Sequence, residues 1–261
     1  MLLQNKIILI TGSTTGIGAA TARRCVAEGA RVMLHGRNEE HAKALCKELG
    51  ANAHYVIGEL TAPETPTLIV ETTIKTFGAL HGLVNNAAIY PRHTIDTCSS
   101  KGFDEVMNVN VKAPMLITQA AVKEFRKQKT GGAVVNIGSM NAYCGQPDLL
   151  IYAASKGALM TMTRNLADAL GREHIRVNLL NVGWTPTETE IALKKSEGLS
   201  DDWFEHVPAL YAPTGRLQTP AQVAPHVAFW LSDLSAPTSG AVYEVEQYPI
   251  IGRNRISDVK L

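Results

Sequence analysis

Short apolar, β-branched runs alternate with longer segments of helical spacing along nearly all of this 261-residue chain. We expect strands over residues 7–11, 31–35, 53–57, 82–85, 133–138, 176–180 and 240–245. We expect helices over residues 17–28, 39–49, 64–77, 101–127 and 152–171. Runs such as Ile7-Ile8-Leu9-Ile10 are apolar at every position, which is typical of parallel strands buried on both faces. The alternation predicts an α/β fold, a Rossmann-like doubly wound parallel sheet of about seven strands with helices on both faces.

No linker, repeat or change of composition divides the chain, so residues 1–261 are expected to form a single domain. Residues 185–220 are the exception to the alternation, because proline, aromatic and acidic residues follow one another there without a simple period. We expect this segment to form a lid over the site.

The composition favours small-molecule chemistry. A formal net charge of +1 gives no overall field for nucleic acid or an anionic membrane. The 8 histidines and 4 cysteines show no metal-ligand spacing, so no metal site is expected. The apolar run near the N-terminus is too short to span a bilayer, and we expect a cytoplasmic protein with reduced thiols.

A glycine-rich turn follows the first expected strand and leads directly into a helix. The turn reads Thr11-Gly12-Ser13-Thr14-Thr15-Gly16-Ile17-Gly18. Glycines allow a tight turn and a close approach of the backbone to phosphate, and the helix start attracts the negative charge of a pyrophosphate. Taken alone, the spacing also fits a turn that serves only packing. In this context it predicts a dinucleotide site made by residues Gly12, Ser13, Thr14, Thr15, Gly16, Ile17 and Gly18.

The end of the second expected strand indicates which dinucleotide is bound. An acidic residue there would hold the adenosine ribose 2′-hydroxyl of NAD, whereas an arginine accommodates the 2′-phosphate of NADP. The sequence reads His35-Gly36-Arg37-Asn38 and contains no acid at this point. Arg37 offers a planar set of donors suited to phosphate, although a solvated loop arginine is the alternative. We therefore expect NADP(H) to be preferred over NAD(H).

Tyr152 and Lys156 stand at positions i and i+4 of an expected helix, which places them on one face about one turn apart. A phenol has a pKa of about 10, so acid–base work near neutrality requires about 4 kcal/mol of stabilisation of its anion. The Lys156 ammonium and a cationic nicotinamide could supply it. An isolated tyrosine and lysine with this spacing are more often a pair on the protein surface. The position of Tyr152 and Lys156 in the fold must therefore decide whether the pair is catalytic.

Together with three further segments, these residues resemble the short-chain dehydrogenase/reductase superfamily over nearly the whole chain. The glycine turn resembles the family's TGxxxGxG loop, and residues 85–88 resemble its NNAG motif with Ala88 in the last position. Residues 108–110 match a helix segment that ends on a functional asparagine, here Asn110. Ser139 precedes Tyr152 by 13 residues, which is the family's usual spacing.

The resemblance implies a role for each matching residue. Tyr152 would be the general acid and base, Ser139 would orient the substrate oxygen, Lys156 would lower the tyrosine pKa, and Asn110 would sustain a proton relay. Tyr152 and Lys156 would also contact the coenzyme. The further coenzyme contacts implied are Glu59, Leu60, Asn86, Ala87, Ala88, Val182, Gly183, Thr185 and Thr187. The family also implies a homotetramer or dimer.

Four positions depart from the family pattern. Ala88 replaces a glycine, Glu59 stands where aspartate is common, and Val182 replaces the proline of an NPG segment. Residues 247–254 do not resemble the usual C-terminal ending. None of these changes removes a catalytic group.

The implied activity is hydride transfer between NADP(H) and a carbonyl or secondary alcohol. Polar groups in the loops expected at the substrate, Arg92, Asn141, Gln146 and Glu188, favour a small polar substrate of the polyol or sugar type. A 3-oxoacyl thioester reductase is the enzymatic alternative, and a non-catalytic NADP(H)-sensing protein is the alternative from another class. Four aromatic residues could line the substrate pocket or anchor the lid: Trp184, Trp203, Phe204 and Tyr211.

Overall fold

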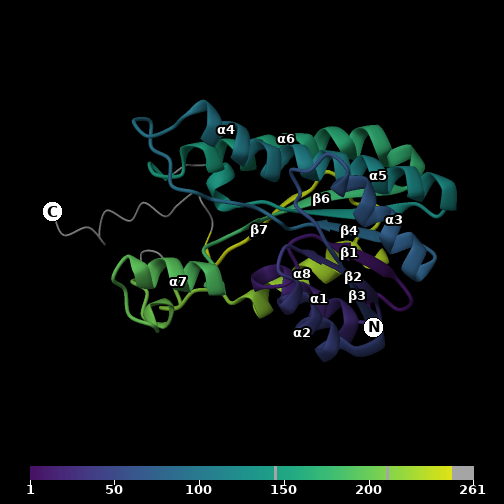
Figure 1. Ribbon diagram of the computed structural model, residues 1–261, viewed down its shortest axis with the longest axis horizontal. Helices are drawn as coiled ribbons and strands as arrows, with labels where there is room; N and C mark the ends of the chain where they lie inside the picture. Colours follow the sequence, from purple (N-terminus) through teal and green to yellow (C-terminus); the bar gives the residue numbers. More distant parts are fainter. Residues whose placement is uncertain (144–145, 210–211, 249–261) are drawn as a thin grey trace.

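The computed structural model describes residues 1–143, 146–209 and 212–248, and its centre is a seven-stranded sheet (Figure 1). The strands are β1 (Ile7–Ile10), β2 (Arg31–Gly36), β3 (Ala53–Ile57), β4 (Gly82–Asn85), β5 (Gly132–Ile137), β6 (Ile175–Val182) and β7 (Val242–Val245). Their order is β3-β2-β1-β4-β5-β6-β7, and all neighbours are parallel. The predicted doubly wound sheet is confirmed.

Helices cover both faces of the sheet, as Figure 1 shows. One face packs against α1 (Gly16–Ala27), α2 (Glu39–Leu49) and α8 (Pro220–Leu231). The other packs against α3 (Thr65–Phe77), α5 (Ala113–Gln128) and α6 (Leu150–Leu170). Side chains alternate along a strand, so Ile8 and Ile10 of β1 enter the first core and Leu9 enters the second. This explains why β1 is apolar at every position. None of the helices described has the length and apolar composition needed to cross a bilayer.

Two helical features differ from the prediction. The single helix expected over residues 101–127 is divided into α4 (Ser100–Met107), a π-helical turn (Asn108–Lys112) and α5. Pro114 has no N–H, so the carbonyl of Asn110 would lack its donor in a regular α-helix. Helix α8 was not predicted, although Thr219 and Gln222 form a capping box at its start and Pro220 occupies its first position.

The segment after β6 forms a small unit of its own. It contains α7 (Glu188–Ser196) and a short helical turn (Trp203–Glu205), and Figure 1 shows it beyond the ends of the strands. Its own apolar cluster consists of Trp203, Val207, Ala212 and Leu217. A lid over the site stays a prediction, which this placement fits.

A buried row of polar side chains joins β4 and β5 to the helices behind them. The Asn85 amide donates to Asn136 Oδ1 at 2.8 Å and to Thr118 Oγ1 at 3.1 Å. The Asn136 amide donates to Thr163 Oγ1 at 2.8 Å. Because each of these groups is buried, a shift of register would leave polar atoms without partners. The row therefore fixes α5 and α6 against the strands that end at the site.

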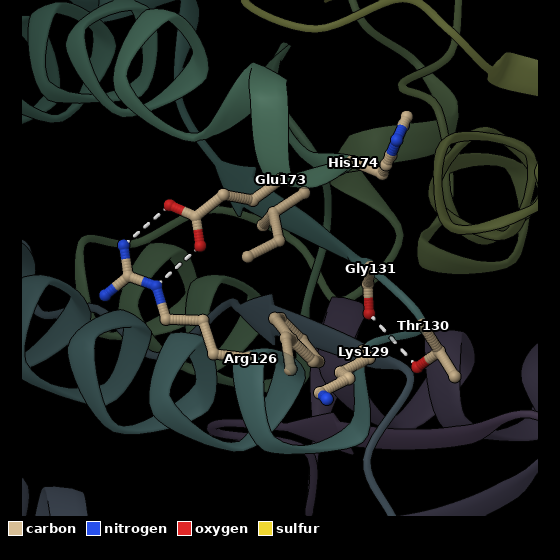
Figure 2. A pocket seen from close by; sticks show the side chains of 8 residues that line it. Arg126, Lys129, Thr130, Gly131, Glu173 and His174 are labelled. Atoms are coloured by element: carbon tan, nitrogen blue, oxygen red, sulfur yellow. Dashed lines mark hydrogen bonds and ion pairs between the residues drawn. The ribbon is translucent and has the colours of Figure 1, made fainter.

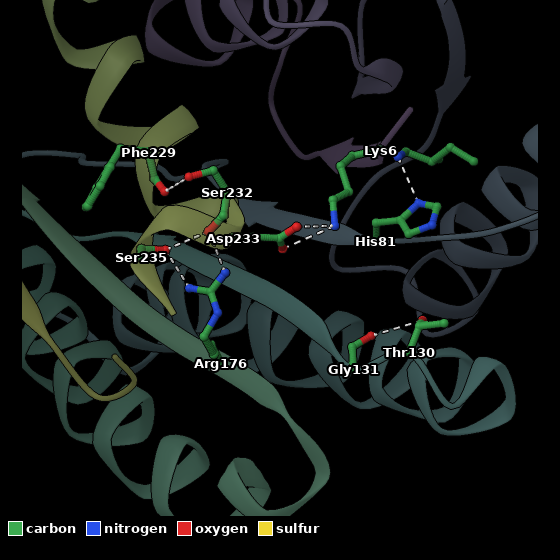
Figure 3. Close-up of polar contacts among 10 residues, drawn as sticks. Lys6, His81, Thr130, Gly131, Arg176, Phe229, Ser232, Asp233 and Ser235 are labelled. Carbon is green, nitrogen blue, oxygen red and sulfur yellow. Dashed lines mark hydrogen bonds and ion pairs between the residues drawn. The ribbon is translucent and has the colours of Figure 1, made fainter. Parts of the chain in front are cut away.

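Two shallow clefts lie at the amino ends of the strands. The first, of about 330 Å³, is lined by residues that include Arg126 and Glu173, which form a two-pronged ion pair at 2.6 and 2.7 Å (Figure 2). The second, of about 310 Å³, lies beside Lys6, which pairs with Asp233, and Arg176, whose guanidinium donates to carbonyls at the end of α8 (Figure 3). Both clefts are at the edge of the sheet opposite the glycine turn.

Candidate active site

The glycine turn lies at the carboxyl end of β1 and contacts the end of β4 closely. A Cβ atom at Gly12 would lie 2.8 Å from Ala87 Cα, and one at Gly18 would lie 2.3 Å from the carbonyl oxygen of Gly12. Gly12 and Gly16 also have positive φ angles of 59° and 55°. The turn therefore requires glycine at these three positions, as a cradle for a pyrophosphate does.

The segment after β4 is fastened to this turn. Asn86 Nδ2 donates to the carbonyls of Thr11 and Gly12, both at 2.9 Å. Thr11 Oγ1 accepts from the backbone N–H groups of Asn86 and Ala87 at 3.0 and 3.1 Å. The structure thus brings the predicted coenzyme residues of the first and fourth strands together.

His35 is a residue of this region whose role the sequence did not reveal. Its ring is buried, Nδ1 lies 3.5 Å from the backbone nitrogen of Gly12, and Nε2 lies 3.1 Å from the carbonyl oxygen of Gly58. Burial lowers the pKa of His35, against a smaller opposing effect of its bond to Gly58. The neutral imidazole with its proton on Nε2 satisfies both contacts, so His35 ties the glycine turn to the end of β3.

Arg37 directly follows β2 and is exposed to solvent. Its guanidinium Nη1 is 3.5 Å from Glu59 Oε2, which brings two predicted coenzyme residues together. A Cβ atom at Gly36 would lie 2.6 Å from the Thr14 methyl group, so a side chain at 36 would displace that threonine. Leu60, the third predicted residue here, is buried.

Ser139, Tyr152 and Lys156 meet at the carboxyl end of β5. The Lys156 amine is buried and donates to the carbonyl of Ile137 at 2.7 Å, and its Nζ lies 5.6 Å from the centre of the Tyr152 ring. Ser139 follows β5 directly, and its N–H donates to Asn181 Oδ1 at the end of β6 at 3.0 Å. A Cβ atom at Gly138 would lie 2.2 Å from that same Oδ1. Asn181, which the sequence did not single out as a site residue, therefore positions Ser139.

Burial shifts the pKa values of Tyr152 and Lys156 in opposite directions. Burial raises the pKa of Tyr152 to about 12, while a hydrogen bond with Ser139 lowers it and nearby Tyr90 and Glu190 raise it further. Burial lowers the pKa of Lys156 to about 8, so the amine still carries a proton at neutral pH. Lys156 is not among the groups that shift the pKa of Tyr152 here, and burial is the largest of the effects that do. That the lysine makes the phenol more acidic stays a prediction.

Asn110 lies in the π-helical turn and is buried. Its amide nitrogen donates to the Ile89 carbonyl at 2.8 Å and to Ser155 Oγ at 3.0 Å, and its oxygen accepts from the Ile89 N–H at 2.9 Å. The side chain therefore holds the segment after β4 against α6. The proton relay implied for Asn110 stays a prediction.

The wall next to Tyr152 is aromatic and contains a buried carboxylate. The rings of Tyr90 and Tyr152 meet edge to face, with 6.1 Å between their centres. Tyr90 hydrogen-bonds Thr187, whose hydroxyl also accepts from the N–H of Glu190 at 3.2 Å. The Trp184 indole donates to Glu190 Oε1 at 2.9 Å, and the charge of Glu190 contributes to the raised pKa of both tyrosines.

The remaining predicted residues lie along the same edge. Val182 ends β6, Thr185 Oγ1 donates to the carbonyl of Gly183 at 3.1 Å, and the methyl group of Thr187 lies 3.0 Å from where a Cβ of Gly16 would be. Ala88 follows the fastened segment after β4. Tyr211 lies outside the described residues, as does most of the unusual C-terminal segment. Within residues 1–143, 146–209 and 212–248, no three His, Cys, Asp or Glu side chains gather as a metal site would need.

Comparison with known proteins identifies what this arrangement resembles. A family model described as short chain dehydrogenase matches residues 6–198. An uncharacterized oxidoreductase of Thermotoga maritima is 33% identical, with 94% of this chain and 98% of that protein covered. The L-fucose dehydrogenase of Mus musculus is 32% identical over 87% of this chain and 82% of its own. The structure of a 3-ketoacyl-(acyl-carrier-protein) reductase from Brucella melitensis complexed with NADH is 27% identical, covers 97% of this chain and 100% of that chain, and superposes with a TM-score of 0.84.

Proposed function

Since this chain belongs to the short chain dehydrogenase family, we propose that it transfers a hydride between NADP(H) and a small polar secondary alcohol or ketone. The observation that carries the proposal is the meeting of Ser139, Tyr152 and Lys156 at the same sheet edge as the glycine turn. The cradle at Gly12 and Gly18, which a Cβ atom would fill, fits a coenzyme pyrophosphate. The bound nicotinamide would supply or accept the hydride.

The protein's own residues would manage one proton and the position of the substrate. In reduction the Tyr152 hydroxyl donates a proton to the substrate oxygen, and in oxidation its anion removes one. The Ser139 hydroxyl donates a hydrogen bond to the same oxygen. The Lys156 ammonium favours the phenolate because it places a positive charge beside the ring.

The preference for NADP(H) rests on Arg37. We expect Arg37→Ala to lower kcat/KM with NADPH by about 10- to 100-fold, because charged hydrogen bonds to a phosphate contribute about 1.5–3 kcal/mol. With NADH the change should stay within about threefold, since NADH has no 2′-phosphate. Initial rates with both coenzymes test this, with Arg126→Ala at the opposite edge as the control. A wild-type enzyme that works better with NADH would refute the preference.

Glu190 favours a substrate that is rich in hydroxyl groups. Its carboxylate is buried, accepts a hydrogen bond from the Trp184 indole, and raises the pKa of both Tyr90 and Tyr152. A buried carboxylate accepts hydrogen bonds from hydroxyls and repels anionic groups. A polyol or sugar satisfies this requirement, as does its ketone, while a 3-oxoacyl thioester remains the alternative because a reductase of that class is among the similar structures.

A panel of polyols, free sugars, simple secondary alcohols and 3-oxoacyl thioesters, followed by coenzyme absorbance, tests the substrate class. We expect Glu190→Gln to lower kcat/KM for the best polyhydroxylated substrate by about tenfold, the loss of one charged hydrogen bond. Glutamine can still accept from Trp184, so the wall is preserved. For a simple secondary alcohol the change should stay within about twofold. Turnover of thioesters alone, unaffected by this substitution, would select the alternative.

The proposal includes a cytoplasmic enzyme that assembles as a homotetramer or dimer. Family membership supports an oligomer, and light scattering of the purified protein tests it.

A further inference from the structure

Helix α1 receives its N-terminal acidic partner from the lid rather than from its own first turn. The first turn of α1 contains no acidic residue, and Thr15 at its N-cap makes no side-chain capping bond. The N–H of Gly16 instead donates to Glu188 Oε2 at 2.9 Å, although these residues are 172 positions apart in the sequence. The contact between Gly16 and Glu188 therefore depends on the tertiary fold and not on the local sequence.

This N–H belongs to the turn that would hold the coenzyme pyrophosphate. Glu188 begins α7, and the Thr187 methyl group just before it lies 3.0 Å from the Cβ position of Gly16. A carboxylate and a phosphate bind a helix N-terminus for the same reasons, because both accept N–H donors and both carry negative charge. The Glu188 carboxylate and the pyrophosphate consequently compete for one donor and repel each other.

The geometry points to Glu188 as a determinant of coenzyme affinity, an internal anion that has to leave the glycine turn before the pyrophosphate occupies it. The inference rests on the proposed function, since it concerns the coenzyme of that function. Because Glu188 is the first residue of α7, we expect its departure to displace the start of this helix. The other end of α7 leads to Glu197, which is 3.7 Å from Arg92 on the segment after β4. Coenzyme binding is thereby coupled to a helix that reaches across the site.

The test compares coenzyme binding by wild type, Glu188→Gln and Glu205→Gln, measured as dissociation constants by fluorescence titration with NADPH and NADH. We expect Glu188→Gln to bind both coenzymes about fivefold more tightly, since one unit charge about 4 Å away in water contributes about 1 kcal/mol. The factor should be the same for both coenzymes because both contain the pyrophosphate. Glu205→Gln, an exposed charge removed elsewhere in the lid, should leave both constants within about 1.5-fold.

A second readout follows the helix itself. Trp184 is bonded to Glu190 and lies under Lys194, both in α7, so its emission reports displacement of that helix. We expect Glu188→Ala to shift the emission of the free protein toward that of wild type saturated with oxidised coenzyme. Unchanged dissociation constants in Glu188→Gln, or unchanged emission in Glu188→Ala, would overturn the inference. Wild type that binds neither coenzyme would contradict the proposed function instead.

Discussion

Tyr152→Phe should abolish turnover while leaving coenzyme binding intact. The substitution removes one hydroxyl and keeps the ring that packs edge to face on Tyr90. General acid–base catalysis contributes about 10²- to 10⁴-fold, so we expect kcat to fall by about 10³-fold in both directions. The dissociation constant for NADPH should change by less than about twofold, because the glycine turn is untouched. Steady-state rates and a fluorescence titration measure the two quantities.

Tyr90→Phe is the matched control, because it removes a neighbouring phenol and keeps the ring contact. We expect its kcat to stay within about threefold of wild type. The reverse pattern, with Tyr90→Phe inactive and Tyr152→Phe active, would show that the proton donor has been misassigned. A wild-type protein that binds NADPH yet turns over no member of the substrate panel would favour the non-catalytic sensor.

Lys156→Met should stabilise the fold and destroy the activity. Burial lowers the pKa of Lys156 to about 8, whereas an unfolded lysine titrates near 10.5. Between these values the unfolded chain holds the additional proton, so wild-type stability rises as the pH increases from about 8 to 10.5. Below pH 8 the buried Lys156 ammonium lowers the free energy of unfolding by about 3 kcal/mol.

Methionine has a similar length and no charge, and it loses only the bond to the Ile137 carbonyl, about 1 kcal/mol. We therefore expect a net gain of about 2 kcal/mol in the free energy of unfolding at pH 7, and no gain at pH 10.5 and above. Urea unfolding at the two pH values measures this, with the exposed Lys101→Met as the control. The kcat should fall by at least about 100-fold. A variant less stable than wild type at pH 7 would show that Lys156 is not held against its charge.

The sheet could be predicted because each strand carries its own signal. Parallel strands covered on both faces are mostly apolar, as β1 is and as β5 is except for Asn136, so their positions were evident to within a residue or two. The division of the helix over residues 101–127 was not evident, since its spacing is helical on both sides of Pro114. Helix α8 was missed because its residues are nearly all apolar, with Pro225 inside, and show no helical period.

The residues of the candidate site also fall into two groups: those predicted from short sequence motifs, and those positioned by contacts between segments far apart in the sequence. The sequence predicts the glycine turn and the Tyr152–Lys156 pair from short motifs, and Ser139 from the spacing before the tyrosine in the family that the chain resembles. The positions of Glu188 and Asn181 were not found, since both depend on contacts between distant segments. The sequence put Glu188 among the residues near the substrate, whereas the structure places it on the glycine turn. The cap at Thr187, whose hydroxyl accepts from the Glu190 N–H, is a further contact that the sequence did not reveal.

The buried polar row formed by Asn85, Asn136, Thr118 and Thr163 limits how far this protein can be made heat-resistant by redesigning its interior. Leucine and valine side chains of similar volume would remove the free-energy cost of burying the amides. Such a change ordinarily raises the melting temperature. The amides, however, are what make one alignment of strands and helices better than its neighbours. Variants without these amides would resist heat better, but the strands and helices that end at the candidate active site would no longer have one preferred alignment.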